Sequence, residues 1–540
     1  MPHGPDGDAA ASQAGAGTAN VTGRGEAWRA VHRPTTVEEV VALVAEARRR
    51  QVALYPVSTG LNWGYGSRSP PAPNCDLVDL SAMNRIRNAD QVSPQSPVAV
   101  IEPGVTQRQF VEFLRERCPG LMLNPTGSAL DTSILGNALD RGVGYFGPRV
   151  DDVFGLEVVT GAGTVLQTGF RRLGEGSPLA HSHPYGLGPM LDGLFFQGNV
   201  GIVTSACLRL TPRREREVAV SMGLRREADL PAFVDALARL KREGLLTSVT
   251  HIGNRARTQA TLTAGLVRYF ERQCGLDAAE ARREAAAALP LVAPHEWTAL
   301  VAVAGTAGQV RAVLRDVRRR VGGIARVRVV TDALLDVGYR VAHALRFLPW
   351  GRANAAAIAA MRPLHGLVKG EPTDAAVDNL LWQFGRPDLP AAQLDASNCG
   401  LLYVNPALPM DGQFVARFLR QMHDEASGFG FELAVTINVE TSTSMVAVAN
   451  LLFDRSVPAE VERAHACARA LLDLIHREGL EVYRARVDTM ADVVDPRSTY
   501  WQTVRALKRV LDPDNIIAPG RYNLLDDGVA APSSVANPLE

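Results

Sequence analysis

A glycine-rich loop is the first part of the sequence whose residue types could bind a ligand. It runs from Tyr55 to Gly66 with the sequence YPVSTGLNWGYG and follows a short apolar run. Small residues let backbone N–H groups converge, and converging N–H groups bind phosphate. The loop matches neither GxGxxG nor GxxxxGK[ST], which argues against a Rossmann or P-loop site. Taken alone it is weak evidence, because short motifs give many false matches.

Three further motifs have the same character. DTSILGNALDRGVGYFG begins at Asp131 and offers glycines that permit close backbone approach. GLGPMLDGLFFQGNVGIVT, from Gly186 to Thr204, leads from a glycine-rich turn into a strand-like run. NIIAPGR ends in Arg521, where a cation follows a Pro-Gly turn. Each of these motifs is also typical of an ordinary loop, so only their combination carries weight.

The elements that must position these loops alternate between helical and strand-like patterns. The stretch from Arg33 onward starts with a threonine cap, and Val40, Val41, Val44 and Ala45 then give an apolar stripe at helical spacing. Residues 52–60 follow as a short buried strand that ends in a glycine-containing loop. Residues 155–169 read as a β-hairpin. After about Arg214 the sequence pattern changes. Three amphipathic helical segments follow, with strand-like runs between or after them, which indicates a second α+β domain.

The four motifs, in this order, resemble the FAD-binding domain of the vanillyl-alcohol oxidase and p-cresol methylhydroxylase (PCMH) family. The segments KGEPTDAAVDNLLWQFG, GLLYVNPALPMDG and LLFDRS look like successive parts of that family's cap domain, which binds the substrate. The resemblance spans roughly Val31 to Arg521. Several motifs in register are far more specific than any one of them.

The resemblance implies a two-domain α+β fold. It consists of a PCMH-type FAD-binding domain with two α+β subdomains and an α+β cap domain built on an antiparallel sheet. We expect a disordered tail at 1–25, the FAD-binding domain at 26–214 and the cap at 215–485. A C-terminal segment at 486–525 would return to the FAD-binding domain, and 526–540 would form a second tail.

The cofactor contacts that the family implies come from all four motifs. The first loop would cradle the FAD pyrophosphate, and the strand and turn at Glu102–Thr106 would lie beside the adenine. Arg521 would place a cation beside the flavin pyrimidine ring, where it stabilises developing negative charge. The implied cofactor-binding residues are Pro56, Ser58, Thr59, Gly60, Leu61, Asn62, Tyr65, Gly66, Pro103, Gly104, Val105, Gly136, Asn137, Gly142, Ile202, Val203 and Arg521.

The phenol-oxidising members of the family bind their substrate as a phenolate between two tyrosines and an arginine. Tyr65, Tyr483 and Arg484 match that set. A free phenol has a pKa near ~10, and an adjacent cation lowers such a pKa by about 1–3 units. A phenolate pushes electrons into its ring, so hydride loss from the para benzylic carbon becomes easy and leaves a quinone methide. The catalytic candidates are therefore Tyr65, Tyr483, Arg484 and Arg521.

Three features depart from the family pattern. The stretch TINVETSTSMVAVANLLFD lacks the His or Tyr that often tethers FAD, which predicts non-covalent FAD. Ser128 occupies the position of the aspartate that lies near the flavin in phenol oxidases, so the possible bases are Asp131 and Ser128, unless the site has no base at all. The family's YTPYGDH becomes YFGPRVDDV, in which Asp151 or Asp152 could supply a carboxylate, although we expect both to be exposed loop acids. These changes favour an atypical substrate, such as a larger natural product.

Composition narrows the classes of partner. Lys+Arg and Asp+Glu both number 57, a balance that exerts no long-range attraction on nucleic acid or an anionic membrane. No apolar run is long enough to span a bilayer, and no secretory signal is visible, so we expect a cytoplasmic protein. The six cysteines are scattered without CxxC spacing, and we expect no metal site.

The sequence thus predicts an FAD-dependent oxidase or dehydrogenase of a para-substituted phenol. Two alternatives stay open: an FAD-dependent oxidase of a non-phenolic alcohol or amine in natural-product biosynthesis, and a non-catalytic protein that keeps the FAD fold. The expected partners are a small aromatic substrate and either O2 or a redox protein as electron acceptor. A homodimer is compatible with the family, but no interface is legible in the sequence.

Overall fold

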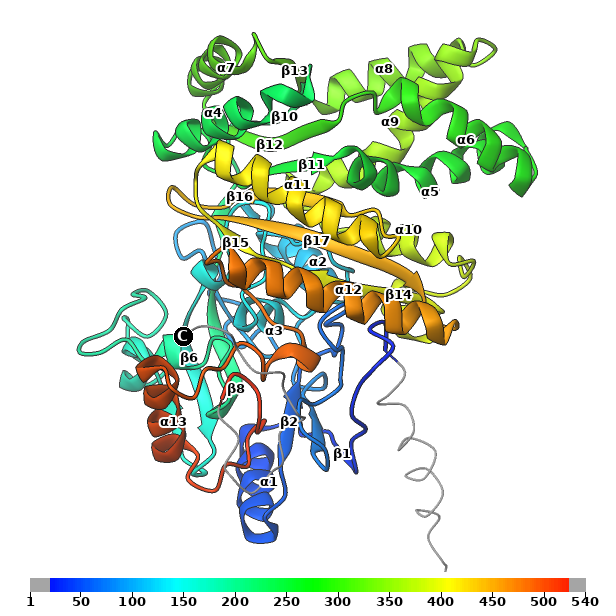
Figure 1. Cartoon of the computed structure of the whole chain (residues 1–540). Helices are drawn as coiled ribbons and strands as arrows, with labels where there is room; N and C mark the ends of the chain where they lie inside the picture. The colour runs from blue at the N-terminus through cyan, green and yellow to red at the C-terminus, as the bar shows by residue number, and fades with distance from the viewer. Residues whose placement is uncertain (1–19, 524–540) are drawn as a thin grey trace, which may run out of the picture.

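The structure is a computed structural model that describes residues 20–523. Figure 1 shows a lower part that contains the N-terminal elements together with helix α13 (Thr499–Leu511), and an upper part made of a broad sheet and many helices. Three sheets form the lower part: a parallel sheet of order β1-β3-β2, an antiparallel sheet of order β4-β8-β6-β7, and the pair β5-β9.

The elements of the lower part are short, and its loops are long. The strands are β1 (Val31–His32), β2 (Leu54–Val57), β3 (Asp76–Asp79), β4 (Val98–Ile101), β5 (Leu121–Met122), β6 (Val153–Thr160), β7 (Val165–Gln167), β8 (Gly201–Arg209) and β9 (Thr211–Pro212). The helices are α1 (Val37–Arg50), α2 (Gln107–Arg117), α3 (Ile134–Leu139) and, near the C-terminus, α13 (Thr499–Leu511).

Helix α1 shows how local sequence fixes these elements. Thr36 caps the helix by accepting a hydrogen bond from the Glu39 amide, as the sequence predicted. Acidic residues occupy the first turn and arginines the last, which complements the helix dipole. The buried stripe Val40, Val44 and Ala47 then packs against the parallel sheet.

The upper part is built on one antiparallel sheet of eight strands, with the order β13-β10-β12-β11-β16-β17-β14 and with β15 paired to β17. This confirms the antiparallel cap that the family resemblance implied. The strands are β10 (Arg216–Leu224), β11 (Thr250–Asn254), β12 (Trp297–Gly305), β13 (Ala325–Val330), β14 (Cys399–Val404), β15 (Ala407–Leu408), β16 (Ala434–Val439) and β17 (Met445–Asp454).

Helices cover one face of this cap sheet. Helices α11 and α12 lie along β16 and β17 in Figure 1, and their apolar stripes join the largest core cluster. The cap helices are α4 (Leu230–Arg242), α5 (Arg255–Cys274), α6 (Ala278–Val292), α7 (Ala307–Val321), α8 (Asp332–Ala344), α9 (Pro349–Leu367), α10 (Ala375–Gln383), α11 (Gly412–Gly428) and α12 (Pro458–Arg477).

The other face of the cap sheet is polar in its middle and meets the lower part. His251 of β11 lies opposite Asn438 of β16, and Asn450 of β17 lies opposite Tyr403 of β14. Two ring contacts join this face to loops of the lower part: Tyr145 with His251, at 4.5 Å between centroids, and Tyr65 with Tyr403, at 5.0 Å. This polar face of the cap sheet, which carries His251, Asn438, Asn450 and Tyr403, therefore covers the loops of the lower part. We call it the ceiling.

The chain ends depart in part from the expected tails. Residues 1–19 and 524–540 lie outside the described residues, but 20–25 are ordered. Val21 is buried, and its amide donates to Asp395, while its carbonyl accepts from the Leu401 amide. The predicted tail at 1–25 is therefore wrong for residues 20–25, although glycine and alanine are frequent in the first 25 residues. At the other end, Ile517 bridges to Leu54 of β2. We propose the division at about 214 and 485, since no sheet pairing crosses it within residues 20–523.

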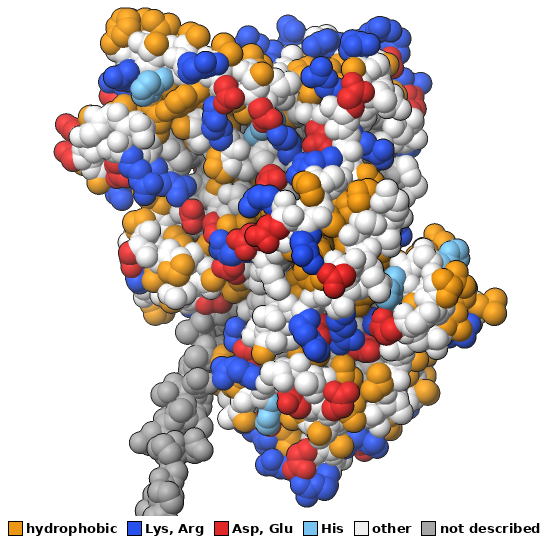
Figure 2. Space-filling view, turned by 180° about the vertical axis from the view of Figure 1, so that it is seen from behind, with side chains coloured by type: hydrophobic (Ala, Val, Ile, Leu, Met, Phe, Trp, Pro, Cys, Tyr) orange, Lys and Arg blue, Asp and Glu red, His pale blue; other side chains and the backbone are white. Residues whose placement is uncertain are grey.

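An apolar patch marks the outer end of the cap. Hydrophobic side chains gather there in Figure 2, where Val337, Val341, Phe347 and Trp350 of helices α8 and α9 and of the turn between them are each at least half exposed. The homodimer expected from the family resemblance stays a prediction.

No helix within residues 20–523 is both long and apolar enough to cross a bilayer.

Candidate functional site

A long cleft separates the loops of the lower part. Its empty space is about 1020 Å³, counting the open mouth. Its walls come from all four motifs and from the segment that leads out of the cap. The residues that line it are Tyr55–Asn62, Ser67, Leu80, Pro103, Thr132, Ser133, Gly136, Asn137, Leu139, Asp140, Phe195, Gln197, Gly198, Gly201, Val203, Arg484, Ile517, Ala518 and Arg521.

The first two loops touch each other and leave backbone surface for a ligand. Gly60 has φ +74°, a left-handed conformation that favours glycine. A Cβ on Gly136 would stand 2.1 Å from Ser58 Oγ, so any larger residue there must displace the Ser58 hydroxyl. The buried Oδ1 of Asn137 and Oγ1 of Thr132 have no hydrogen-bond partner among the described residues. Orphan polar atoms in a glycine-lined cleft fit a bound dinucleotide.

Most of the predicted cofactor residues line this cleft. They are Pro56, Ser58, Thr59, Gly60, Leu61, Asn62, Pro103, Gly136, Asn137, Val203 and Arg521.

The remaining six lie behind the cleft and support it. A Cβ on Gly104 would stand 2.2 Å from the Ser81 carbonyl, and Val105 and Ile202 are core residues. Gly142 packs on the side chain of Asn137, and Gly66 packs on that of Val487. Tyr65 belongs to the tyrosine pair rather than to the cleft wall.

Asp140 joins the two candidate arginines. It lies at the carboxyl end of α3, where its Oδ2 accepts from Arg484 at 2.6 Å and its Oδ1 accepts from Arg521. Although burial favours the neutral acid, the two guanidinium charges hold the pKa of Asp140 below its ordinary value. Asp140 is not among the site residues predicted from the sequence, yet it fixes both arginines at one end of the cleft.

The two candidate tyrosines, Tyr65 and Tyr483, meet beside Asp140 and its two arginines. Their hydroxyl oxygens lie 3.5 Å apart, and the Arg484 guanidinium carbon lies 3.9 Å from the centroid of the Tyr65 ring. The Asn405 amide donates a hydrogen bond to the Tyr65 hydroxyl. Burial raises the pKa of both phenols, so both remain protonated at neutral pH and can donate hydrogen bonds. Tyr65, Tyr483 and Arg484 thus form one cluster, from loops more than 400 residues apart in the chain.

The two candidate bases do not reach the cleft. Asp131 is half-exposed and forms an ion pair with Arg108 at 2.8 Å. Ser128 shares a 2.7 Å hydrogen bond with Thr126. Neither lines the cleft, because the loop before α3 turns both side chains toward neighbours of their own. No cluster of three or more metal-ligating side chains occurs within the described part of the chain.

The two acids of YFGPRVDDV differ from each other. Asp151 is exposed, as expected, but Asp152 is only partly exposed and accepts a 2.8 Å hydrogen bond from Asn124. Burial raises the pKa of Asp152 to about 6. The expectation that both are exposed loop acids is therefore wrong for Asp152.

A buried carboxyl on the ceiling was also missed. Glu440 follows β16, is 8 % exposed, and its Oε1 has no hydrogen-bond partner among the described residues. Burial first, and then the Asp151 charge, raise the pKa of Glu440 to about 7. The charge of Glu440 also acts on the Tyr483 phenol. A lone glutamate in a TSTS-rich turn gives no sequence signal, so only the fold reveals it.

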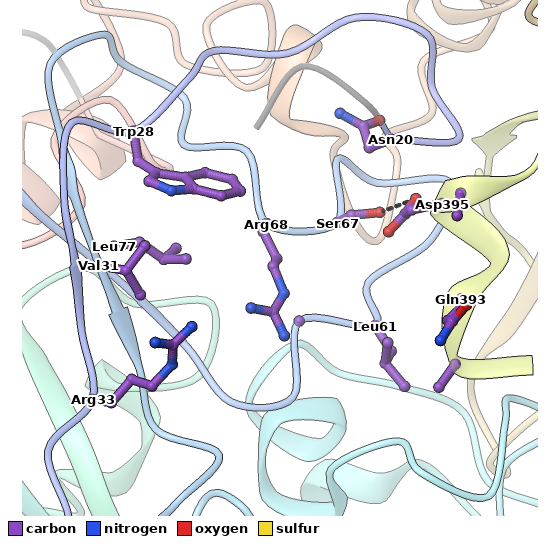
Figure 3. Close-up of a pocket in the computed structure, with 13 residues that line it drawn as sticks. Asn20, Trp28, Val31, Arg33, Leu61, Ser67, Arg68, Leu77, Gln393 and Asp395 are labelled. Atoms are coloured by element: carbon purple, nitrogen blue, oxygen red, sulfur yellow. Dashed lines mark hydrogen bonds between the residues drawn. The ribbon is translucent and has the colours of Figure 1, made fainter. Parts of the chain in front are cut away.

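A second cavity lies on the opposite side of the first loop (Figure 3). Trp28 and Arg68 lie on one side of it and Asp395 on the other, and Gly60, Leu61 and Ser67 belong to both cavities. Arg68 donates to Asp79 at 3.1 Å and to the Thr59 carbonyl at 3.1 Å. The arginine therefore braces the loop from behind.

Comparison with known proteins identifies the cofactor. Residues 28–169 match a family model described as an FAD binding domain. The chain is 32% identical to 1'-carboxy-chondrochloren decarboxylase of Chondromyces crocatus, over 92% of this chain and 90% of that protein. It is 27% identical to the 4-cresol dehydrogenase [hydroxylating] flavoprotein subunit of Pseudomonas putida, over 91% and 87%.

A solved structure shares the fold along nearly the whole chain. It is 4-ethylphenol oxidase from Gulosibacter chungangensis in complex with isoeugenol, with a TM-score of 0.79, 23% identity, and coverage of 96% of this chain and 94% of that one. Together with the cleft, these matches establish a flavoprotein with FAD as its cofactor. The chain is an FAD-dependent oxidoreductase and belongs to the PCMH-type FAD-binding flavoprotein family.

Proposed function

We propose that this enzyme removes a hydride from the benzylic carbon of a para-substituted phenol that it binds as a phenolate. The observation that carries the proposal is the cluster of Tyr65, Tyr483 and Arg484 at one end of the cleft. The names of the 4-cresol dehydrogenase and of the 4-ethylphenol oxidase support a phenolic substrate.

The cluster would stabilise a phenolate in two ways. The hydroxyls of Tyr65 and Tyr483 are protonated, so each can donate to a substrate oxygen, and hydrogen bonds to an anion are the strong ones. The Arg484 charge would lower the phenol pKa from ~10 by about 1–3 units. Asp140 already pairs with Arg484, and this pairing fixes the guanidinium over the Tyr65 ring.

FAD would be held by Ser58–Asn62, Gly136, Asn137 and Arg521, and it supplies the hydride acceptor. The β16–β17 hairpin carries no His or Tyr, and from this we infer that FAD is bound without a covalent link. Gly136 and Gly60 leave the backbone uncovered where the cofactor would lie.

Glu440 replaces Asp131 and Ser128 as the proposed base. A phenol beside a cation has a pKa of about 7–9 on the reasoning above. A carboxylate with a pKa of about 7 matches that value, which favours proton transfer between them. The free Oε1 of Glu440 could thus receive the phenol proton, and the influence of the Glu440 charge on the Tyr483 phenol favours this assignment.

The fate of the quinone methide defines a second candidate reaction. Addition of water would give a hydroxylated product, whereas loss of a proton would give an alkene. If the carbon next to the benzylic position carries a carboxylate, loss of CO2 moves its bonding electrons into the quinone methide and gives a vinylphenol. The name of the 32% identical relative, a decarboxylase of a carboxylated compound, favours this last outcome.

Anaerobic mixing tests the proposal. Oxidised enzyme is mixed with a 4-alkylphenol or with the methyl ether of that phenol, and flavin absorbance is followed. We expect bleaching with the phenol and none with the ether, because the ether cannot form a phenolate. Equal bleaching by both compounds, or bleaching by no phenol at all, would reject the mechanism. Tyr483→Phe should slow bleaching by the phenol.

A further inference from the structure

One strip of the cap sheet is built for a polar ligand. Residues His251 and Gly253 of β11 share a face, because side chains alternate along a strand. Asn438 of β16 lies on the same face, because it pairs with His251. Asn450 of β17 lies on that face as well, and it pairs with Tyr403 of β14. The buried atoms His251 Nε2 and Asn450 Oδ1 have no hydrogen-bond partner among the described residues. Orphan atoms on a ceiling over the tyrosine pair indicate a polar ligand.

Arg257 reaches across this strip. It stands in the first turn of α5, three residues after the cap Asn254, whose Oδ1 accepts from the Arg257 amide at 2.9 Å and from the Val435 amide at 3.1 Å. The helix start is therefore fixed to β16. The Arg257 stem lies over Gly253, where its Cγ would be 3.5 Å from an added Cβ. The side chain thus runs along the face that carries His251.

The Arg257 charge acts on the aromatic residues at the ceiling. Burial raises the pKa of Tyr145 and of Tyr403, and Arg257 opposes the rise at both. Burial depresses the pKa of His251 to about 4, and Arg257 adds to that effect. The ring of Tyr403 contacts that of Tyr65 in the phenol cluster, with centroids 5.0 Å apart, so the guanidinium lies within electrostatic reach of the substrate site.

Nothing within residues 20–523 neutralises this cation. Its neighbour Arg255 forms an ion pair with Glu296, but the Arg257 guanidinium has no hydrogen bond or ion pair within the described part of the chain. The first turn of α5 contains no acidic residue. A half-buried cation at a helix N-terminus is unfavourable unless an anion lies opposite, because the helix dipole is also positive there.

We propose that Arg257 binds a carboxylate on the para side chain of the substrate, so that the enzyme selects carboxylated 4-alkylphenols. This rests on the proposed function, which fixes the phenol end at Tyr65, Tyr483 and Arg484. The planar guanidinium of Arg257 offers paired N–H donors that match a carboxylate.

Binding of two inert phenols to the FAD-loaded enzyme separates this proposal from the proposed reaction. 4-Hydroxycinnamate carries a carboxylate, and 4-(1-propenyl)phenol has a methyl group in its place. Neither has a saturated benzylic C–H, so both report binding alone. Dissociation constants are measured by titration calorimetry for the parent, for Arg257→Gln, and for Arg255→Gln as the matched control on the same helical turn.

We expect Arg257→Gln to weaken 4-hydroxycinnamate at least ~10-fold and to change 4-(1-propenyl)phenol by less than about twofold, as a charged hydrogen-bonding pair implies. Arg255→Gln should change neither. An unchanged affinity for 4-hydroxycinnamate, or an equal loss for both ligands, would overturn the carboxylate site. Failure of every 4-alkylphenol to bleach the flavin, with the carboxylate preference intact, would instead reject the hydride-transfer reaction alone.

Discussion

Replacing Glu440 with glutamine should change how the stability of the protein depends on pH. Burial raises the pKa of Glu440 from 4.5 to about 7, so the folded state binds the proton more tightly than the unfolded state. The stability that this group contributes is complete below pH 4.5 and is lost as the pH rises through about 7. Glutamine keeps the shape but cannot ionise, so the loss should disappear.

The magnitude follows from the size of the shift. A rise of about 2.5 pKa units corresponds to about 3.4 kcal/mol of free energy of unfolding once both states have titrated. Between pH 5 and pH 8, the Glu440→Gln variant should gain about 2.5 kcal/mol relative to the parent by the same relation. Asp152, whose pKa is raised to about 6, is present in both proteins and cancels from the difference.

Urea unfolding of the FAD-saturated proteins at pH 5, 6, 7 and 8 measures this difference. Glu432→Gln is the control, because Glu432 is exposed and lies just before the same strand β16. It should follow the parent at every pH. A Glu440→Gln curve parallel to that of the parent would show that the carboxyl does not titrate where its burial places it, and it would remove the basis for its role as a base.

Three further predictions concern the cleft and the phenol cluster. Arg484→Ala should raise the pH at which 4-alkylphenols bleach the flavin by about 1–3 units, because the phenol loses its neighbouring cation; an unchanged pH profile in anaerobic mixing would remove Arg484 from the site. Gly136→Ala should lower the FAD content of the purified protein, because the new Cβ would stand 2.1 Å from Ser58 Oγ, whereas Gly147→Ala, with nothing within 4 Å, should keep full FAD content; equal flavin-to-protein absorbance ratios for the two would contradict the loop geometry. Acid precipitation should release the flavin into the supernatant, since the β16–β17 hairpin offers no His or Tyr for attachment, and yellow colour in the pellet would show a covalent link.

Local sequence was sufficient to predict the glycine-rich cofactor loops and where many helices and strands begin or end. The loop at Ser58–Asn62 lines the cleft because glycine and small polar residues dictate its path without help from distant residues. The cap of α1 is likewise local, since Thr36 and Glu39 are close in the chain. The cluster of Tyr65, Tyr483 and Arg484 needed the family pattern as well, because its members lie far apart in the sequence.

The residues that sequence reasoning missed depend on tertiary register. Asp131 and Asp140 stand at opposite ends of the short helix α3, and only the latter faces the two arginines. His251, Asn438 and Asn450 share a ceiling because β11, β16 and β17 pair in a particular register. A shift of one residue in the pairing of a strand would move its side chains to the opposite face of the sheet. The sequences of the separate strands do not determine this register. Glu440 is identified as a candidate only by its burial, and Arg257 only by the lack of a partner for its guanidinium among the described residues.

The ionisation state of a bound phenol tests the central claim most directly. Ultraviolet difference spectra of 4-(1-propenyl)phenol with oxidised, FAD-loaded enzyme are recorded at pH 9, where a free phenol with a pKa near ~10 is mostly neutral and a bound phenol with a pKa of about 7–9 is mostly ionised. We predict the absorption band of the phenolate on binding to the parent protein, and a mostly neutral bound phenol in Arg484→Ala. A mostly neutral phenol bound to the parent protein at pH 9 would contradict the assignment of Tyr65, Tyr483 and Arg484 as a phenolate site.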